Sequence, residues 1–320
     1  MPDTYRHDDC PGPEVEISVI VPVFNEEESV WPLYRAITEA LTPMWRSYEI
    51  LLVDDGSRDA TIARARDIVA ADARVSVLRF RRNYGQTAAM TAGIEHARGK
   101  YLVTMDGDLQ NDPADIPMMV SKLEEGNDLV VGWREKRQDK WLSRKLPSMI
   151  ANRLIGRVTG IPIRDNGCSL KVYRADVIKR VPLYSDMHRF IPAMTIPLGA
   201  RVEQVPVRHH ARQFGASKYG LSRIFKVMLD LITVKSLLVF ARRPVTTFSG
   251  FAFACLVAAA MFLVLLHDGG EHLVVEMAVF GLLASLSVFV FLIGVVVAVI
   301  FQTKTFSMAR FDTSLEPRNS

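Results

Sequence analysis

Two apolar segments near the carboxyl end of this chain constrain its fold most strongly. Segment 245–266 contains no charged residue, and Glu276 is the only charged residue of segment 273–301. About 20 apolar residues are enough to cross a bilayer as a helix. Two adjacent helices of this kind in a soluble core would leave no polar face toward water. We therefore predict transmembrane helices over residues 245–266 and 273–301, in preference to two buried core helices.

Lysine and arginine residues indicate how this pair of helices is oriented. They are absent from the linker 267–272, but they flank the pair on its other side as Arg242, Arg243, Lys304, Arg310 and Arg318. The positive-inside rule places that side in the cytoplasm. The polar first residues contain no apolar signal segment. We predict a protein of the cell (inner) membrane with two spans, whose large amino-terminal domain and both termini are cytoplasmic.

The sequence before residue 243 alternates between short apolar segments and helical patterns. Strands are expected at residues 17–23, 49–53, 75–80, 101–105 and 128–131, and helices are expected to end near Leu41 and to span 61–71 and 83–97. Strands that alternate with helices form a mostly parallel, doubly wound sheet. We predict an α/β domain over residues 15–243, a flexible tail at 1–14 and a cytoplasmic tail at 302–320, whose residues 307–320 are expected to be flexible.

The net charge of +4 is distributed unevenly along the chain. Segment 133–157 contains eight Lys and Arg residues against two acidic residues, and segment 201–243 contains nine against two. Within them, 142–158 and 221–240 have helical apolar spacing, which suits a helix at the membrane surface or one packed on the sheet. We prefer the interfacial placement for 221–240 and leave both open for 142–158. No nucleic-acid motif accompanies these segments, so we predict contact with the bilayer and anionic lipid and none with nucleic acid.

Acidic residues follow three of the predicted strands. Glu26 follows the first strand, Asp54 and Asp55 follow the second, and Asp106 and Asp108 follow the fourth. The carboxyl ends of parallel strands meet at one edge of a sheet, where open α/β sheets bind their ligands. Two carboxylates one residue apart can share a hard divalent cation that completes its shell with substrate phosphates. Each segment alone could be a solvated turn, but together they predict a nucleotide-sugar and metal site.

Eight motifs occur in an order that is typical of one enzyme family. They are PVFNE (22–26), VDDGS (53–57), RNYGQTAAM (82–90), DGDLQNDP (106–113), GWR (132–134), DNGCSLKVYR (165–174), HRFIPA (188–193) and VPVRHHARQFGASKYG (205–220). On these motifs the chain resembles the family-2 glycosyltransferases with the GT-A fold. Within that family it is similar to the polyprenyl-phosphate enzymes, the group of dolichol-phosphate mannose synthases and bactoprenol glucosyltransferases.

The resemblance implies a role for several residues. The residues that match the nucleotide pocket are Pro22, Phe24, Glu26, Val53, Asp55, Asp106 and Gly107. Asp106 and Asp108 match the pair that holds Mg²⁺ or Mn²⁺ on the donor diphosphate, with Gln110 beside them. Asp165 matches a catalytic carboxylate near the reacting centre. The residues that match phosphate-binding positions for donor or lipid acceptor are Arg134, Arg212 and Lys218.

The remaining polar residues of the matching segments are open to a plainer interpretation. We interpret Cys168 and Ser169 as packing residues. His209 and His210 could touch the acceptor, although the alternating pattern of their strand makes at least one of them a plain strand residue. A structural role for His188 is as well supported as a functional one.

The activity implied by the resemblance is metal-dependent, inverting transfer of one hexose from a UDP-sugar to a polyprenyl phosphate. Glucose is the expected sugar, while UDP-galactose, a UDP-N-acetylhexosamine and a modified arabinose donor stay open. A processive polysaccharide synthase is the rival enzyme, but its Gln-x-x-Arg-Trp motif and multi-span channel are missing from the sequence. An inert nucleotide-sugar-binding protein is the rival from another class. Two spans per subunit suit a homo-oligomer.

Overall fold

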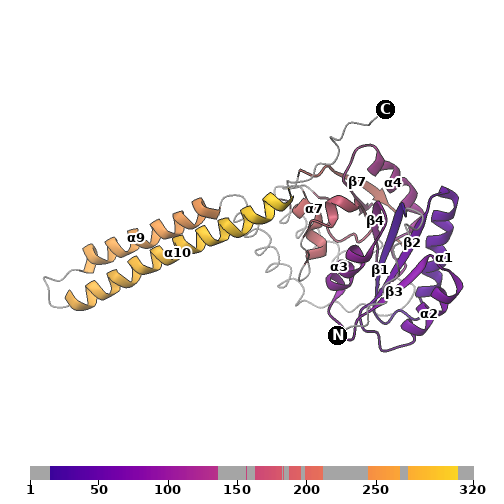
Figure 1. Cartoon of the computed structure of the whole chain (residues 1–320), viewed down its shortest axis with the longest axis horizontal. Coiled ribbons are helices and arrows are strands. Elements are labelled where there is room, and N and C mark those ends of the chain that lie inside the picture. Colours follow the sequence, from indigo (N-terminus) through magenta and orange to yellow (C-terminus); the bar gives the residue numbers. More distant parts are fainter. Residues whose placement is uncertain are drawn as a thin grey trace. The chain divides into compact units, whose positions relative to one another are not determined.

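The computed structural model describes residues 15–135, 156, 163–181, 183, 187–195, 199–211, 244–266 and 273–308. The chain divides into two compact units, Met1–Leu231 and Ile232–Ser320 (Figure 1). The first contains the α/β domain and the second contains two long apolar helices. The amino-terminal tail, the predicted helix 221–240, and segment 142–158 apart from Gly156 lie outside the described residues, so these predictions stay untested.

A single seven-stranded sheet organises the first unit, in the order β3-β2-β1-β4-β6-β5-β7. The strands are β1 (Ile17–Val23), β2 (Tyr48–Asp54), β3 (Val75–Arg79), β4 (Tyr101–Thr104), β5 (Leu129–Arg134), β6 (Lys171–Arg174) and β7 (Val202–Val207). All neighbouring pairs are parallel except those of β6, which runs antiparallel to β4 and to β5. The prediction of a mostly parallel α/β sheet is confirmed.

Helices cover both faces of this sheet (Figure 1). They are α1 (Val30–Leu41), α2 (Thr61–Ala71), α3 (Gln86–His96), α4 (Ile116–Glu124), α6 (Ala175–Ile178) and α7 (Ile191–Thr195), with 3₁₀ turns η1 (Thr42–Met44), η2 (Pro113–Asp115) and η4 (Met187–Phe190). Successive strand residues point to opposite faces. Val19 and Val21 therefore join the core beneath α1, α2 and α4, whereas Ile20 joins the core beneath α3, α6 and α7. Burial on both faces explains the near-continuous apolar strands.

Strand β1 brings the carboxyl ends of its two neighbours to one edge. Val23 is in register with Asp54 of β2, and the N–H of Asp55 donates to the carbonyl of Val23 over 2.9 Å. On the other side, Ile20 is in register with Thr104 of β4, and the N–H of Met105 donates to the carbonyl of Ile20 over 3.2 Å. The acidic segments that follow β2 and β4 therefore leave the sheet on either side of β1.

One helix boundary and one strand differ from the sequence prediction for physical reasons. Helix α3 begins at Gln86, not at Asn83, because Gly85 before it has a φ of +95° that a helix does not allow. Strand β6 was not predicted, since four residues carry too little periodicity to be recognised.

The described residues of the second unit form α9 (Pro244–Leu266) and α10 (Leu273–Met308), and α10 runs past the predicted end at Phe301. Both are long and apolar enough to cross a bilayer. Large side chains such as Phe253, Val264 and Val274 are 68%, 76% and 83% exposed, which suits a lipid environment and not water. The helices pack closely, because Ser287 donates to the carbonyl of Ala252 over 2.8 Å.

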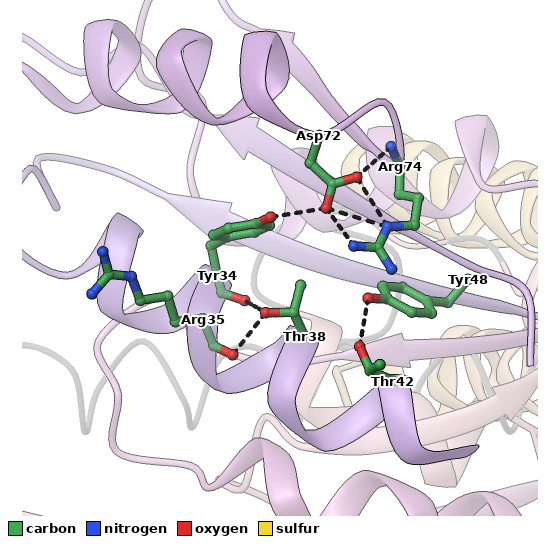
Figure 2. Close-up of polar contacts among 7 residues, drawn as sticks. All are labelled: Tyr34, Arg35, Thr38, Thr42, Tyr48, Asp72 and Arg74. Carbon is green, nitrogen blue, oxygen red and sulfur yellow. Dashed lines mark hydrogen bonds and ion pairs between the residues drawn. The ribbon is translucent and has the colours of Figure 1, made fainter. Parts of the chain in front are cut away.

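A polar network stabilises the first unit on the side away from the acidic edge (Figure 2). The hydroxyl of Tyr34 on α1 donates to Asp72, the residue after α2, over 2.9 Å. Arg74 donates to the same carboxylate from Nε over 2.9 Å and from Nη2 over 2.8 Å, and its guanidinium lies 4.6 Å from the ring centre of Tyr48. The hydrogen bonds from Arg74 lower the pKa of Asp72 to about 2.

Asp72→Asn should lower the free energy of unfolding by about 1 kcal/mol at neutral pH, after allowance for solvent screening. The folded-state pKa of about 2 lies below the unfolded value of about 3.9. The contribution is therefore present above about pH 4 and is lost as the pH falls through about 2. Thermal unfolding of the full chain in detergent, near neutral pH and near pH 3, measures the difference. Asp67→Asn, at an exposed position on α2, is the control. An equal loss at both pH values would contradict this account.

Candidate functional site

A cavity lies at the carboxyl ends of β1, β2 and β3. Its volume is about 210 Å³. It is lined by Phe24, Gly56, Ser57, Arg58, Arg79, Arg81, Arg82 and Asn83. Four arginines in so small a volume favour an anionic ligand. Of the residues predicted for the nucleotide pocket, the structure places Phe24 in this cavity.

The other predicted pocket residues make contacts of different kinds. Pro22 is half-buried at the end of β1, whereas Val53 is fully buried and packs in the core beneath α3. Glu26 accepts a hydrogen bond from the hydroxyl of Ser29 over 2.7 Å, at the residue that precedes α1. Val53 and Glu26 therefore have structural reasons for their positions, and their predicted contact with nucleotide stays a prediction.

Asp55 holds the loop that precedes α3. Its two carboxylate oxygens accept hydrogen bonds from the backbone N–H groups of Tyr84, over 2.7 Å, and Gly85, over 2.9 Å. Burial raises the pKa of Asp55, and these two N–H donors act in the opposite direction. Gln86 follows this loop directly, and its side-chain amide donates to Oδ1 of Asp106. Asp55 thus fixes a loop that in turn orients Asp106.

The Asp106–Asp108 segment forms a tight turn after β4. A Cβ atom at Gly107 would lie 3.0 Å from a side-chain carbon of Val23 and 3.3 Å from the carbonyl oxygen of Pro22, so glycine fits this close approach to β1. Leu109 has a φ of +60°, and the N–H of Gln110 donates to Oδ1 of Asp108 over 3.2 Å.

The residues of this turn fit a hard divalent cation. Asp106 is half-buried and Asp108 is 8% exposed, and both carry the oxygen ligands that Mg²⁺ and Mn²⁺ prefer. No group of three His, Cys, Asp or Glu residues that could hold a metal occurs within the described part of the chain. A cation here would take further ligands from substrate phosphates, as is usual for Mg²⁺.

Asp165 and Arg134 form a two-point ion pair beside this turn. Nε of Arg134 lies 2.6 Å from Oδ2 of Asp165, and Nη2 lies 2.9 Å from Oδ1. Both side chains are largely buried, with exposed fractions of 13% for Arg134 and 6% for Asp165. A Cβ atom at Gly167 would lie 3.1 Å from Nη2 of Arg134. The structure therefore joins a predicted catalytic residue to a predicted phosphate-binding residue.

Hydrogen bonds connect the Asp165 segment to the Asp106 turn. The N–H of Asp106 donates to the hydroxyl of Ser169 over 3.2 Å, and the side chain of Asn111 donates to the same hydroxyl over 2.7 Å. Our interpretation of Ser169 as a packing residue fits its burial, and the structure adds the two hydrogen bonds that its hydroxyl accepts. The interpretation also holds for Cys168, which is 1% exposed and whose thiol pKa burial raises to about 11.

The histidines contact other parts of the fold. Nδ1 of His188 lies 2.7 Å from the hydroxyl of Thr87 on α3, in a buried pair. His209 forms a β-bridge with Asn111, and Nε2 of His210 lies 3.2 Å from Oδ2 of Asp112. Their predicted contact with an acceptor stays untested. Arg212 and Lys218 lie outside the described residues.

Around the Asp106 turn, sequence reasoning missed the contacts of three residues: Gln86, Asn111 and Ser169. Each lies inside a matching motif, namely RNYGQTAAM, DGDLQNDP or DNGCSLKVYR. The available signal was therefore a polar residue within a motif, which needs a hydrogen-bond partner where the fold covers it. The partners lie 20 to 63 residues away, and no local pattern identifies them.

Comparisons with known proteins agree with this geometry. The family described as Glycosyl transferase family 2 matches residues 18–181. The dodecaprenyl-phosphate galacturonate synthase of Rhizobium johnstonii is 47% identical over 268 residues, which are 82% of this chain and 79% of that protein.

Solved structures support the fold. Glucosyl-3-phosphoglycerate synthase from Mycobacterium tuberculosis, in complex with Mn²⁺, UDP and phosphoglyceric acid, superposes with a TM-score of 0.55 at 18% identity, over 69% of this chain and 77% of that chain. Its complex with Mg²⁺ and UDP gives a TM-score of 0.54 at 18% identity, over 69% and 80%. The predicted GT-A fold is confirmed. Taken with the matching family and the Rhizobium relative, these observations show that this chain belongs to the polyprenyl-phosphate glycosyltransferases of glycosyltransferase family 2.

Proposed function

We propose that this protein transfers galacturonate from UDP-galacturonate to a membrane polyprenyl phosphate, with inversion at the anomeric carbon. The observation that carries the proposal is the 47% identity, over 82% of the chain, to a dodecaprenyl-phosphate galacturonate synthase. The relative's sugar favours galacturonate over the glucose that we expected from the sequence. UDP is the nucleotide bound by the mycobacterial enzyme of the same fold, and the acidic edge supplies carboxylates for a cation on its diphosphate.

The acceptor needs little chemical activation. A phosphate monoester has its second pKa near 6, so most of the lipid phosphate is dianionic at neutral pH. One of its oxygens attacks the anomeric carbon, the bond from that carbon to the diphosphate oxygen breaks, and UDP leaves with the electron pair. No proton has to be removed from the nucleophile. The protein must instead bring two anions together.

The described residues suit that task. Arg134 presents a planar guanidinium whose orientation is fixed by the two-point contact with Asp165, and arginine binds phosphate oxygens in a fork. Asp165 then acts by holding Arg134 in place and not as a general base. Gln86 orients Asp106, and Asp106 with Asp108 would hold Mg²⁺ or Mn²⁺. When bound, such a cation neutralises charge on the leaving diphosphate.

The apolar helices α9 and α10 explain how the enzyme meets its acceptor. Their length and composition suit a membrane anchor, and an anchored catalytic unit encounters lipid substrates in two dimensions. The flanking cations favour a cytoplasmic catalytic unit, on the side where nucleotide sugars are made. The basic segment around Arg212 and Lys218 is proposed to receive the lipid phosphate.

A donor screen tests the sugar. Membranes that contain the full-length protein and added polyprenyl phosphate should convert UDP-galacturonate at least about tenfold faster than UDP-glucose, since a site built for a charged group discriminates strongly. The lipid-linked product is measured after extraction into organic solvent. Equal or faster turnover of UDP-glucose would overturn the galacturonate assignment and would leave the polyprenyl-phosphate class intact.

The metal role is tested with Asp108→Asn. This variant keeps the shape of the side chain but removes a charged oxygen ligand, so turnover should fall by at least about a hundredfold. Asp176→Asn is the control, because Asp176 is an exposed carboxylate on α6 that pairs with Arg174. Thermal unfolding in detergent should be the same for both variants. Turnover that survives both Asp108→Asn and a chelator would rule out the cation site.

The positioning of Arg134 is tested with Gly167→Ala. The added methyl group would lie 3.1 Å from Nη2 of Arg134, so it shifts the guanidinium without changing any charge. We expect the kcat/KM for polyprenyl phosphate to fall about threefold to tenfold, as small misplacements do. Asp165→Asn should give a larger loss of the same kind. Gly199→Ala is a poor comparison because its φ of +83° adds strain, whereas Gly250→Ala in α9 meets no atom within 4 Å and serves as the control. A loss confined to the donor KM would contradict this role.

A further inference from the structure

Three segments of the first unit meet at the side chain and backbone of Asn111. The first is the Asp106–Asp108 turn, which ends three residues before Asn111 in the chain. The second is the Asp165 segment, which reaches Asn111 through Ser169 and Cys168. The third is the segment that follows β7, where His209 forms an isolated β-bridge with Asn111.

Asn111 contacts Ser169 and Cys168 through its side-chain amide. Nδ2 of Asn111 donates to the hydroxyl of Ser169 over 2.7 Å, and Oδ1 accepts a weak hydrogen bond from the thiol of Cys168 over 3.7 Å. The same hydroxyl accepts the N–H of Asp106 over 3.2 Å. A serine hydroxyl has two acceptor positions. The hydroxyl of Ser169 therefore uses both of them to join Asn111 and Asp106.

Burial makes this junction rigid. Asn111 is 4% exposed, Ser169 is 6% exposed and Cys168 is 1% exposed. Water cannot easily replace a hydrogen bond that is lost in such a place, and the groups left behind bear a desolvation penalty. Further contacts extend the junction in both directions. The N–H of Gly167 donates to Asp165 over 3.2 Å, and the N–H of His210 donates to the carbonyl of Gln110 over 2.8 Å.

We propose that Asn111 and Ser169 form a positioning pair for the glycosyl transfer. The pair sets the separation between the turn that would hold the cation and the Asp165–Arg134 ion pair that would hold the acceptor phosphate. It acts through these groups and does not itself contact the reacting atoms. The inference rests on the proposed function for its account of catalysis, but the junction itself is defined by the hydrogen bonds above.

The chain offers a matched control. Asn127 also uses its side-chain amide in two hydrogen bonds, to the carbonyl of Lys122 over 2.8 Å and to the carboxylate of Glu203. It lies before β5, and β5 runs in the same direction as β4 because both are antiparallel to β6. Asn127 is therefore at the opposite edge of the sheet from Asp106. Asn127→Ala removes similar bonds without touching the site.

The experiment compares Asn111→Ala, Ser169→Ala, the double variant and Asn127→Ala in the full-length protein. Three quantities are measured in detergent: kcat for lipid glycosylation, the affinity for UDP with Mn²⁺ by calorimetry, and the temperature of unfolding. Each single variant at the junction should lower kcat by about tenfold or more, since small misplacements of reacting groups are costly. The affinity for UDP with Mn²⁺ should fall by about threefold to tenfold, because the Asp106 turn loses its support.

The double variant decides whether the two residues act as one unit. Its kcat should lie within about twofold of the kcat of the less active single variant. Either substitution alone already removes the hydrogen bond between Asn111 and Ser169, so the second substitution should add little. Asn127→Ala should keep kcat within about twofold, whatever its unfolding temperature. Losses that multiply in the double variant, or an equal loss of kcat in Asn127→Ala, would overturn the proposal. If Asn111→Ala fails to fold, the comparison is made between Ser169→Ala and Ser169→Thr. The Thr variant keeps the hydroxyl and should retain more activity than the Ala variant. The reverse order of activity would overturn the proposal.

If the proposed function is wrong but the positioning pair is right, the measurements would give a different pattern. A wild-type protein that turns over no uronate donor would remove the galacturonate assignment. The affinity for UDP with Mn²⁺ would still separate the junction variants from Asn127→Ala. If the junction variants keep both the affinity for UDP with Mn²⁺ and the kcat with an accepted donor, the positioning pair is ruled out. The proposed function would be unaffected by that result.

Discussion

The reversed direction of β6 is the constraint on which the site depends. The parallel strands β1, β2 and β4 send their carboxyl ends to one edge of the sheet, and a further parallel strand would send only its own carboxyl end there. Because β6 is antiparallel to β4, its amino end lies at that edge instead. The residues that precede β6, from Asp165 to Leu170, therefore lie beside Asp106. Thr104 secures the arrangement by donating to the carbonyl of Ser169 over 3.1 Å.

Buried charge at this edge is balanced in several ways. Asp55 is compensated by two backbone N–H donors, and Asp165 by the guanidinium of Arg134. Burial lowers the pKa of Lys171, whose ammonium group donates to the carbonyl of Cys168, and the nearby carboxylates of Asp106 and Asp165 oppose that shift. Several unlike charges in one small volume are costly to bury unless each is paired or hydrogen-bonded. The buried charges of Asp55, Asp165 and Lys171 are therefore compensated within the fold itself.

The sequence patterns predicted those helices and strands that depend on residues close together in the chain. The apolar strands before Asp54 and Asp106 and the span of α2 were predicted closely, because burial on two faces and helical spacing are local signals. The antiparallel β6 and the junction at Asn111 were not, because both arise from contacts between distant segments. Val53 illustrates a second limit: its side chain lies in the core beneath α3, and the nucleotide contact that its motif implies stays a prediction. A motif marks a segment, and only the fold decides which of its side chains faces the ligand.

The left-handed backbone of Leu109 has a consequence for how this edge responds to ligands. A non-glycine residue with a φ of +60° is strained, and glycine would relieve the strain. Leucine instead packs its side chain against the hydrophobic core, so the turn is anchored by apolar contact. The conformational entropy lost in shaping the turn is therefore lost when the chain folds, and not when a ligand arrives. The packing of Leu109 thus fixes the shape of the turn in the folded chain before any ligand binds.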